Sequence, residues 1–585
     1  MSASTRTHGG GATAPGDDLT TIMLSWVLLP VAVLLCAVGG LAWAAGHLLA
    51  LLTGAELALP VTAAPELAVR LAQSPGAVDG AFRAVGARQS PGPAGLFWAV
   101  LFVLAAGLTV LAIVAVRRWL AHDGGGCRAT AGARWAGRAQ EASLVVAHNP
   151  STRAGRLVAG RSVRTGRLLA GADCISAVGF GPNGSGKTTG LIAPNVSEWA
   201  GPVVMTTTKV ADLALIHSHR ASLGPVCVVA PAGAPGYETA GWSPVAYAID
   251  AEAADRMADW LVEASGLATD PKSKPWLIQA RKYVKPLLLA ANLSGRGIAA
   301  FTDWVYAGRD ASDDVRDVLL GHGETAAWRE YQSTWSIHAE GVGSVLFTAY
   351  GIADAYQRPT IRASAEQPEM FTADALLDAG CATLVVLAPE SDIDRLAPVF
   401  TALVSSVIHA AEQRAAACGG PLSPRLLLAL DEAGTIFRYP RIANLLTTAR
   451  GNGIQLLLVY HDLAQIEQLF TPRIARTVLS NAKLRILLPG QGDLETLRYF
   501  SALLGQTRVS RASVTRGERG HHSTSTADHA EDLAPLHSLR ELPTHLAVLQ
   551  YQNLPATRVR LRFCHRDKHL RRLLASKDEP VQEAW

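Results

Sequence analysis

Closely spaced cysteines are missing from this sequence. Its 585 residues include seven cysteines, and no two of them form a CxxC pair. The thiols stand singly at Cys36, Cys127, Cys174, Cys227, Cys381, Cys418 and Cys564. Disulfide frameworks and zinc ribbons both need cysteines at characteristic spacings, so this pattern argues against either one. We therefore expect reduced thiols.

A large excess of one charge is also missing. The chain has 53 basic and 49 acidic residues, a formal net charge of +4. So small a net charge does not identify a nucleic-acid-binding protein, and any basic surface must be local. Hydrophobic residues make up 49% of the chain, which is apolar for a purely cytosolic enzyme. The abundance of alanine, glycine and arginine over lysine suggests a GC-rich bacterial genome.

Charged side chains are missing from two long stretches. Residues 22–52 and 95–116 contain no Asp, Glu, Lys or Arg, and about 20 apolar residues suffice to cross a bilayer core. We predict two transmembrane helices, since the first stretch is much longer than a signal peptide's apolar region and has no basic segment beside it. Two buried core helices are the alternative. The predicted membrane anchor covers residues 22–120, with an N-terminal tail at 1–21 and a connecting loop at 53–94.

Basic residues indicate the orientation of these spans. Five arginines follow the second span, whereas three acidic residues balance the three arginines of the loop. The five are Arg117, Arg118, Arg128, Arg134 and Arg138. Because such residues concentrate on the cytoplasmic side, we expect a two-pass protein of the bacterial inner membrane. Its termini and its large C-terminal part would lie in the cytoplasm, and its loop outside.

A phosphate-binding loop follows the membrane anchor. The apolar run "CISAVGF" leads into "GPNGSGKT" at residues 181–188, which matches GxxxxGK[ST] in the order of strand, loop and helix start. Glycines let backbone N–H groups close around phosphates, the lysine pairs with the β- and γ-phosphates, and the threonine ligates Mg²⁺. The residues expected to bind ATP are Gly181, Gly184, Ser185, Gly186, Lys187, Thr188 and Thr189.

An apolar run ending in two acids supplies the second nucleotide motif. "RLLLALDEAG" begins at residue 425 and places Asp431 and Glu432 after a predicted strand. We expect Asp431 to hold the Mg²⁺ shell and Glu432 to polarise the attacking water. Such a segment is weak evidence alone, but paired with the phosphate-binding loop it is strong.

Periodicity between and after the two motifs predicts an α/β fold with an insertion. Strand-like runs at 201–208, 225–231, 381–389, 453–460 and 482–489 alternate with helical segments, which is typical of a parallel sheet with crossover helices. From residue 250 to about 356, apolar residues recur at spacings of three and four, which predicts a separate all-α domain. The predicted segments are nucleotide-binding parts at 121–249 and 366–560, an inserted domain at 250–365 and a basic tail at 561–585.

The order of these segments resembles the TraG/TraD-type coupling proteins of bacterial conjugation and type IV secretion. The resemblance rests on "GRSVRTGRLL", "GSGKTTGLIAPN", "PWLIQARKYVKPLLLAA", "LDEAG" and "NAKLRILLPGQGDLETLRYFSALLGQTRV", and it extends to about residue 565. It implies a homo-hexameric, membrane-anchored ATPase with a RecA-like P-loop domain. Such a ring would move relaxase-bound single-stranded DNA, with or without protein, into a type IV secretion channel.

The resemblance also implies two further catalytic residues. Arg450, in "TTARGNGIQ", stands where such proteins carry an arginine that reaches a neighbouring subunit's γ-phosphate. His461, in "VYHDLAQ", stands where the family usually has Gln, and its protonation near neutral pH would make γ-phosphate sensing depend on pH. The alternative is that Gln465 or Asp462 makes that contact. Thr207 replaces the Asp of many relatives, and we assign it no role.

Two other functions remain open at this point. An FtsK/HerA-like translocase of double-stranded DNA is disfavoured, because those proteins lack a long helical insertion between the two nucleotide motifs. A docking scaffold that binds ATP only to hold a ring together is disfavoured by Glu432. The faint ABC-transporter signature "NLSGRG" lies too far before the acidic motif to carry its usual role.

Several polar segments have less specific interpretations. Basic residues of the inserted domain would meet phosphates or an acidic protein signal, unless they are solvated helix positions: Lys272, Lys274, Arg281, Lys282 and Lys285. Residues 510–532 are rich in Gly, Ser and Thr, and we predict a mobile loop. Residues 558–574 suggest an edge strand and a surface or membrane-facing helix. A zinc site at Cys564, His565 and His569 lacks a fourth ligand.

Overall fold

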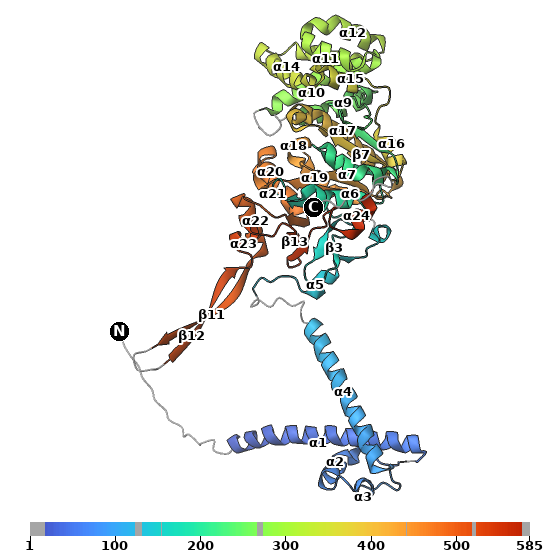
Figure 1. The fold of residues 1–585 in the computed structure, drawn as a ribbon, viewed down its shortest axis with the longest axis vertical. Helices are drawn as coiled ribbons and strands as arrows, with labels where there is room; N and C mark the ends of the chain where they lie inside the picture. Colours follow the sequence, from blue (N-terminus) through green and yellow to red (C-terminus); the bar gives the residue numbers. More distant parts are fainter. Residues whose placement is uncertain are drawn as a thin grey trace, which may run out of the picture. The chain divides into compact units, whose positions relative to one another are not determined.

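The computed structural model describes residues 18–55, 57–122, 132–153, 155–265, 273–439, 441–516 and 522–575. The backbone alone is described at 18–34, 116–122, 151, 510–516 and 522–528. The chain forms two compact units, Met1–Thr130 and Ala131–Trp585. Figure 1 shows their elements, and each unit is described by itself.

Two long helices dominate the first unit. They are α1 (Asp18–Thr53) and α4 (Ala94–His122), and the shorter η1 (Val61–Ala63), α2 (Ala64–Gln73) and α3 (Val78–Ala84) lie between them in the chain. Two glycines let α1 approach its neighbours: a Cβ on Gly39 would lie 2.0 Å from the carbonyl oxygen of Ala64, and one on Gly46 would lie 2.6 Å from the Phe82 ring. The loop predicted between the spans is therefore a packed helical segment, with Phe82 and Phe97 in its core.

Three described helices are long and apolar enough to cross a membrane. They are Leu35–Thr53 within α1, Ala94–Ala115 within α4 and Glu390–Cys418. The last is 83% buried inside the second unit, as expected of a core helix. Much of the α4 segment is exposed, with Phe102 at 74%. The N-terminal helices are thus candidate spans, and their two-pass arrangement stays a prediction.

A twelve-stranded mixed sheet forms the centre of the second unit. Its strand order is β1-β3-β2-β14-β13-β10-β4-β9-β8-β5-β7-β6. The parallel strands are β4 (Ala177–Phe180), β5 (Val203–Thr207), β6 (Val226–Val229), β7 (Thr383–Leu387), β8 (Leu426–Leu430), β9 (Ile454–Tyr460) and β10 (Leu484–Leu487). All seven lie within predicted strand-like runs, so the α/β prediction is confirmed. Their register brings Ala177 opposite Leu457 and Leu426 opposite Ile454.

An antiparallel extension of this sheet was not predicted. It contains β1 (Val145–Val146), β2 (Val158–Ser162), β3 (Leu168–Ala170), β13 (Leu546–Tyr551) and β14 (Thr557–Arg560). The prediction of an edge strand near residue 558 is wrong, because β14 pairs with β13 on one side and with β2 on the other. Alternation of buried and exposed residues does not distinguish an edge strand from an interior strand whose second face is open to solvent.

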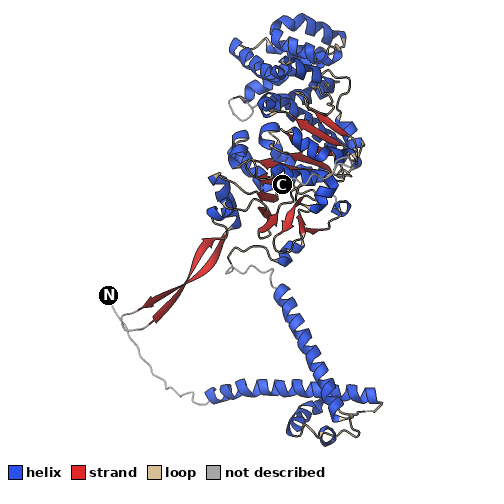
Figure 2. Ribbon diagram, viewed as in Figure 1, coloured by secondary structure: helices blue, strands red, loops and turns tan. Residues whose placement is uncertain are grey.

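Helices cover both faces of the parallel strands (Figure 2). One face packs against α6 (Ala193–Ser197), α7 (Val210–Ala221) and α24 (Lys568–Leu574). The other packs against α17 (Ile393–Cys418), α18 (Ala433–Ile436), α19 (Ile442–Asn452), α20 (Leu463–Leu469), α21 (Pro472–Asn481) and α22 (Leu494–Leu504). Successive residues of β8 alternate between these two cores, as the pleat of a strand requires.

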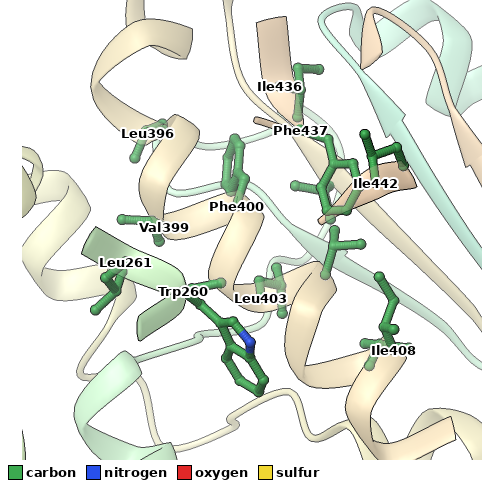
Figure 3. Close-up of a cluster of buried hydrophobic side chains, with 14 of the residues drawn as sticks. Trp260, Leu261, Leu396, Val399, Phe400, Leu403, Ile408, Ile436, Phe437 and Ile442 are labelled. Carbon is green, nitrogen blue, oxygen red and sulfur yellow. The ribbon is translucent and has the colours of Figure 1, made fainter. Parts of the chain in front are cut away.

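The segment predicted to be helical is helical. It contains α9 (Ala251–Glu263), α10 (Lys274–Leu293), α11 (Gly297–Ala307), α12 (Ser312–Gly321), α13 (Thr325–Thr334), α14 (Ala339–Ala353) and α15 (Pro359–Ser364). Figure 3 shows side chains of α17 between Trp260 and Leu261 of α9 and the group Ile436, Phe437 and Ile442. The insertion therefore shares one hydrophobic core with a face of the sheet. Short helices complete the unit: α5 (Arg138–Ala142), α8 (Pro244–Tyr247), α16 (Ala373–Asp378) and α23 (Leu536–Arg540).

The prediction of a loop at 510–532 is wrong. This segment lies in a hairpin of β11 (Gln506–Arg516) and β12 (His522–Asp532), which pair antiparallel from Gln506 with Asp532 to Arg516 with His522. Threonine and valine favour extended backbone, and the two strands satisfy each other's backbone groups. A polar composition therefore does not exclude a strand. His521, which belongs to the predicted loop, lies outside the described residues.

Candidate nucleotide site

Three neighbouring parallel strands position the site. Strand β9 lies between β4 and β8, and all three run in the same direction. The phosphate-binding loop follows β4, Asp431 and Glu432 follow β8, and His461 follows β9. The carboxyl ends of parallel strands meet at one edge of the sheet, where open α/β sheets bind ligands. Residues from three distant parts of the chain therefore converge there.

Glycines shape the loop that precedes η4 (Thr188–Ile192). Gly184 and Gly186 have φ of +80° and +85°, in the left-handed region that side chains rarely adopt. A Cβ on Gly186 would lie 2.4 Å from Cε1 of Phe563, and one on Gly181 would lie 2.5 Å from Ser185 Oγ. That hydroxyl is buried and has no hydrogen-bond partner in the described part of the chain. The loop thus has the tight, backbone-lined form that fits phosphate oxygens.

Lys187, His461 and Glu432 form a closed polar triangle. Lys187 is 6% exposed, and its Nζ lies 3.0 Å from His461 Nδ1 and 3.5 Å from Glu432 Oε1. His461 Nε2 lies 2.9 Å from Glu432 Oε2. An ammonium only donates hydrogen bonds, so Nδ1 accepts and the ring proton sits on Nε2, which donates to Glu432.

The charge state of Glu432 follows from this triangle. Burial alone would raise the pKa of its carboxyl, but the hydrogen bond from His461 and the charge of Lys187 outweigh burial and lower the pKa below its usual range. Glu432 is therefore an ionised acceptor at neutral pH. Its backbone has φ of +53°, which turns the chain sharply between β8 and α18.

Asp431 and Thr188 present oxygen ligands side by side. Asp431 is 4% exposed and its carboxylate accepts a short hydrogen bond from Thr188 Oγ1. Burial raises the pKa of Asp431, while the Thr188 hydrogen bond and the Lys187 charge oppose that rise. Thr206 Oγ1 donates to the Asp431 carbonyl oxygen at 2.7 Å and holds the strand end in place. A hydroxyl beside a carboxylate fits Mg²⁺, which prefers oxygen ligands and keeps several waters.

The two alternatives to His461 are engaged elsewhere. Gln465 Oε1 accepts from the His461 backbone N–H at 2.9 Å, and Asp462 caps α20 by accepting from the Gln465 N–H at 2.8 Å. His461 is thus the side chain that faces Lys187 and Glu432. Gln491 Nε2 donates to the His461 carbonyl oxygen at 2.8 Å. Sequence reasoning missed Gln491, because nothing in its surroundings marks it as a neighbour of β9.

Other residues near the site were also missed. Asp212 of α7 accepts from Thr207 Oγ1 at 2.8 Å, and burial raises the pKa of its carboxyl. Phe563 contacts the phosphate-binding loop from the C-terminal segment, where the Cys564 N–H donates to the Thr189 carbonyl oxygen at 3.0 Å. These contacts join residues far apart in the chain, and no local motif signals them.

Arg450 does not lie at this edge of the sheet. It is exposed in the last turn of α19, whose end leads directly into β9. The seven residues of β9 span about 23 Å at 3.3 Å per residue, so Arg450 lies at the amino end of the strand and His461 at the carboxyl end. Within the described chain, the Arg450 side chain forms no hydrogen bond or ion pair. It does not reach the phosphate loop of its own chain.

Several of the basic residues of the inserted domain, and one residue of the zinc site that was considered and disfavoured, have other partners. Arg281 pairs with Asp255 and Asp259, and Lys285 lies 2.8 Å from Glu330, so these charges are satisfied within the inserted helices. Lys274 is exposed and Lys282 is half-buried, whereas Lys272 lies outside the described residues. His569 Nε2 lies 3.3 Å from Glu198. Among residues described in the structure, no group of three or more His, Cys, Asp or Glu side chains is arranged to hold a metal.

Substituting the loop glycines should separate backbone strain from steric exclusion. A Cβ at Gly184 meets no atom within 4 Å, so Gly184→Ala should lower the free energy of unfolding only by the strain of a left-handed backbone, roughly 1–2 kcal/mol. Gly186→Ala should lower it by about 2–4 kcal/mol, since its Cβ also collides with Phe563. Thermal unfolding in one detergent measures both losses. Phe563→Leu should recover part of the Gly186→Ala loss and none of the Gly184→Ala loss; equal losses in the two glycine variants would refute the Phe563 contact.

Comparisons with known proteins identify proteins similar to this chain. A family model described as the TraM recognition site of TraD and TraG matches residues 425–544, which include Asp431, Glu432, Arg450 and His461. Two curated Escherichia coli proteins, both called conjugal transfer protein TraG, are 22% and 23% identical to the chain over 363 and 406 residues. The alignments cover 58% and 64% of this chain, which spans only 56% and 62% of those relatives.

Solved structures of the conjugative coupling protein TrwB share the fold. The unbound monoclinic form has a TM-score of 0.56 at 17% identity, covering 74% of this chain and 93% of that chain. TrwB in complex with ADP and Mg²⁺ has a TM-score of 0.53 at 17% identity and covers 74% and 94%. The family model and the two TraG relatives show similarity in sequence over part of the chain, the TrwB structures show similarity in fold, and the predicted resemblance to the TraG/TraD-type coupling proteins is confirmed.

Proposed function

We propose that this protein is a membrane-anchored ring ATPase that drives single-stranded DNA into a conjugation channel. One observation carries the ATPase part of this proposal. Lys187 and Thr188 follow β4, Asp431 and Glu432 follow β8, and all four meet at one edge of the sheet. This is the set of groups that nucleotide hydrolysis by a P-loop enzyme requires. The TrwB structures with an ATP analogue and with ADP and Mg²⁺ support nucleotide and Mg²⁺ binding at such a fold.

Each side chain has a chemical role in this proposal. Lys187 leaves the triangle to pair with the β- and γ-phosphates. Thr188 and Asp431 would hold Mg²⁺, which would neutralise charge on the phosphate oxygens. Glu432, ionised beside His461, accepts a proton from the attacking water. His461 keeps the carboxylate oriented and, once Lys187 has moved, is free to hydrogen-bond the γ-phosphate. Gly181, Gly184, Ser185, Gly186 and Thr189 provide the backbone cradle.

The position of Arg450 supports a ring. Because it lies a strand's length from the phosphate loop of its own chain, it reaches a γ-phosphate only from a neighbouring subunit. Rings arise when one surface patch of a subunit binds a different patch of the next. We propose a homo-hexamer in which Arg450 stabilises charge at the transferring phosphoryl group, a contribution of about 10³ to 10⁵ in rate in other NTPases.

Mixing two inactive variants should test this arrangement. Arg450→Ala subunits retain an intact loop, and Lys187→Ala subunits retain an intact arginine. In a random equal mixture, about one quarter of interfaces combine the two intact halves in a heterologous ring. ATP hydrolysis should therefore return to about that fraction of the parental rate. Absence of rescue at every mixing ratio, with hexamers still formed, would exclude Arg450 as a residue acting in trans.

We further propose an inner-membrane location with the ATPase unit in the cytoplasm. The apolar α4 surface and the arginines that follow it support this topology. Proposed partners are single-stranded DNA, a relaxase within its relaxosome and components of the type IV secretion channel. The name of the matched family model, a TraM recognition site, supports a relaxosome contact within residues 425–544.

The cargo is tested by stimulation of ATP hydrolysis. The full chain, reconstituted in lipid nanodiscs, is assayed with single-stranded DNA, double-stranded DNA or no DNA. Stronger stimulation by single strands is the expected result. Stronger stimulation by double strands would favour an FtsK/HerA-like translocase, and hydrolysis unaffected by either would favour a docking scaffold for secreted proteins.

A further inference from the structure

The segments that form the antiparallel end of the sheet, and the residues that follow β14, are rich in basic residues. Residues 132–172 and 545–575 contain 14 Lys and Arg but only two acids, Glu141 and Asp567. The chain as a whole has 53 basic and 49 acidic residues. Figure 1 places α5 and β3 at the end of the second unit that is opposite α11 and α12. The charge is therefore concentrated at one end of this unit.

Six of these arginines belong to three segments that contact one another. The Arg558 guanidinium lies 4.4 Å from the centre of the Trp135 ring. The Ala136 N–H donates to the Ala556 carbonyl oxygen at 2.8 Å, and the Val163 N–H donates to the Arg558 carbonyl oxygen at 3.1 Å. We call the exposed arginines of these segments the basic corner: Arg134, Arg138, Arg164, Arg167, Arg558 and Arg560.

Glu141, the acidic residue beside the basic corner, has a buried side chain. Glu141 is 1% exposed and accepts hydrogen bonds from Ser162 at 2.7 Å and from Thr557. It thereby links α5, the end of β2 and β14. A carboxylate buried in this way ties the three segments together but does not pair with the arginines on the surface.

The six arginines form no ion pair with any other residue described in the structure. Some exposed arginines elsewhere are paired, as Arg70 is with Glu66 and Arg498 with Glu495. An unpaired group of like charges creates a positive field that attracts anionic surfaces. At the tip of the β2–β3 turn, Val163 is 46% exposed, so an apolar side chain stands among the charges.

The basic corner has the chemistry of a membrane-surface contact. It begins shortly after α4, which ends at His122, and juxtamembrane clusters of basic residues bind anionic leaflets. Single-stranded nucleic acid would favour exposed aromatic rings for base stacking, whereas Trp135 is covered by Arg558. We propose that the basic corner binds anionic phospholipid headgroups on the cytoplasmic face of the membrane. This proposal rests on the proposed orientation of α1 and α4.

Amide exchange in nanodiscs tests the contact on the full chain. The protein is reconstituted in phosphatidylcholine alone or mixed with phosphatidylglycerol, and deuterium uptake is followed in the β2–β3 turn and in β14. The anionic mixture should slow uptake there by about fivefold or more, and added salt should reverse the effect. Arg138→Gln/Arg164→Gln/Arg167→Gln/Arg560→Gln should exchange equally in both lipids. A matched control, Arg309→Gln/Arg329→Gln/Arg473→Gln/Arg476→Gln, removes four exposed charges elsewhere and should keep the difference.

Three outcomes would overturn the proposal. The first is equal deuterium uptake by the parental chain in both lipids. The second is slower uptake in anionic lipid that persists in the basic-corner variant. The third is uptake slowed by a single-stranded oligonucleotide in phosphatidylcholine instead of by anionic lipid. The last outcome would assign the corner to nucleic acid. ATP hydrolysis in the same samples reports separately on the nucleotide site. If the lipid contact fails while ATP hydrolysis is intact, the lipid proposal is contradicted and the proposed ATPase function is not. If hydrolysis is lost while the anionic lipid still slows uptake, the ATPase proposal is contradicted and the lipid contact is not.

Discussion

Lys187→Ala should abolish ATP-driven transfer, with hydrolysis falling at least about 100-fold, the scale for losing one preorganised donor to a developing charge. Lys187 is the one ammonium in the triangle, and its Nζ lies within 3.5 Å of both His461 and Glu432. Truncation removes the group that we propose pairs with the β- and γ-phosphates. It also leaves Glu432 without its nearest cation, so the empty site becomes more negative and opposes an anionic nucleotide.

A matched control separates this effect from general damage. Lys483→Ala removes an exposed lysine at the opposite, amino end of β10 and should leave nucleotide binding, hydrolysis and DNA transfer unchanged. Membrane fractionation should find both variants in the membrane, because α1 and α4 belong to a separate compact unit. Transfer by Lys187→Ala at the parental frequency would refute the proposal that ATP hydrolysis powers the protein.

Glu432→Gln should bind ATP at least as well as the parental protein but hydrolyse it about 10²- to 10⁴-fold more slowly, the range for losing a general base. An amide still accepts the hydrogen bond from His461, so the site keeps its shape. It does not take a proton from water, and it no longer holds the Lys187 ammonium away from the phosphates. Fluorescent nucleotide binding and phosphate release measure the two effects separately.

The comparison variant for Glu432 is Glu412→Gln. Glu412 is a half-buried carboxylate of α17 that accepts from Asn452 Nδ2 at 3.3 Å, away from the nucleotide site. Its replacement should leave the hydrolysis rate unchanged and alter stability only slightly. If Glu432→Gln hydrolyses ATP at the parental rate, another group activates the water, and Asp212 would be the next residue to substitute.

Local pattern predicted much of the parallel sheet and part of the site. Each parallel strand is a short apolar run beside a helical segment, so periodicity and turn residues suffice to locate it. The phosphate-binding loop and the Asp431–Glu432 pair are short motifs whose residues are adjacent in the chain. The hairpin at 506–532 and the interior position of β14 were predicted wrongly, because the pairing of a strand depends on partners that no local window contains.

What the sequence by itself determined is the set of candidate chemical groups: a loop of the phosphate-binding pattern, a Thr and an Asp predicted to hold Mg²⁺, a Glu predicted to act as a base, and two apolar stretches. What only the tertiary structure decided is how these groups face one another. Packing β9 between β4 and β8 placed His461 against Lys187 and Glu432 and left Gln465 and Asp462 to local hydrogen bonds. The same strand put Arg450 at the far edge of the sheet. Strand order arises from long-range hydrophobic packing and backbone pairing, which follow from the whole chain rather than from any one motif.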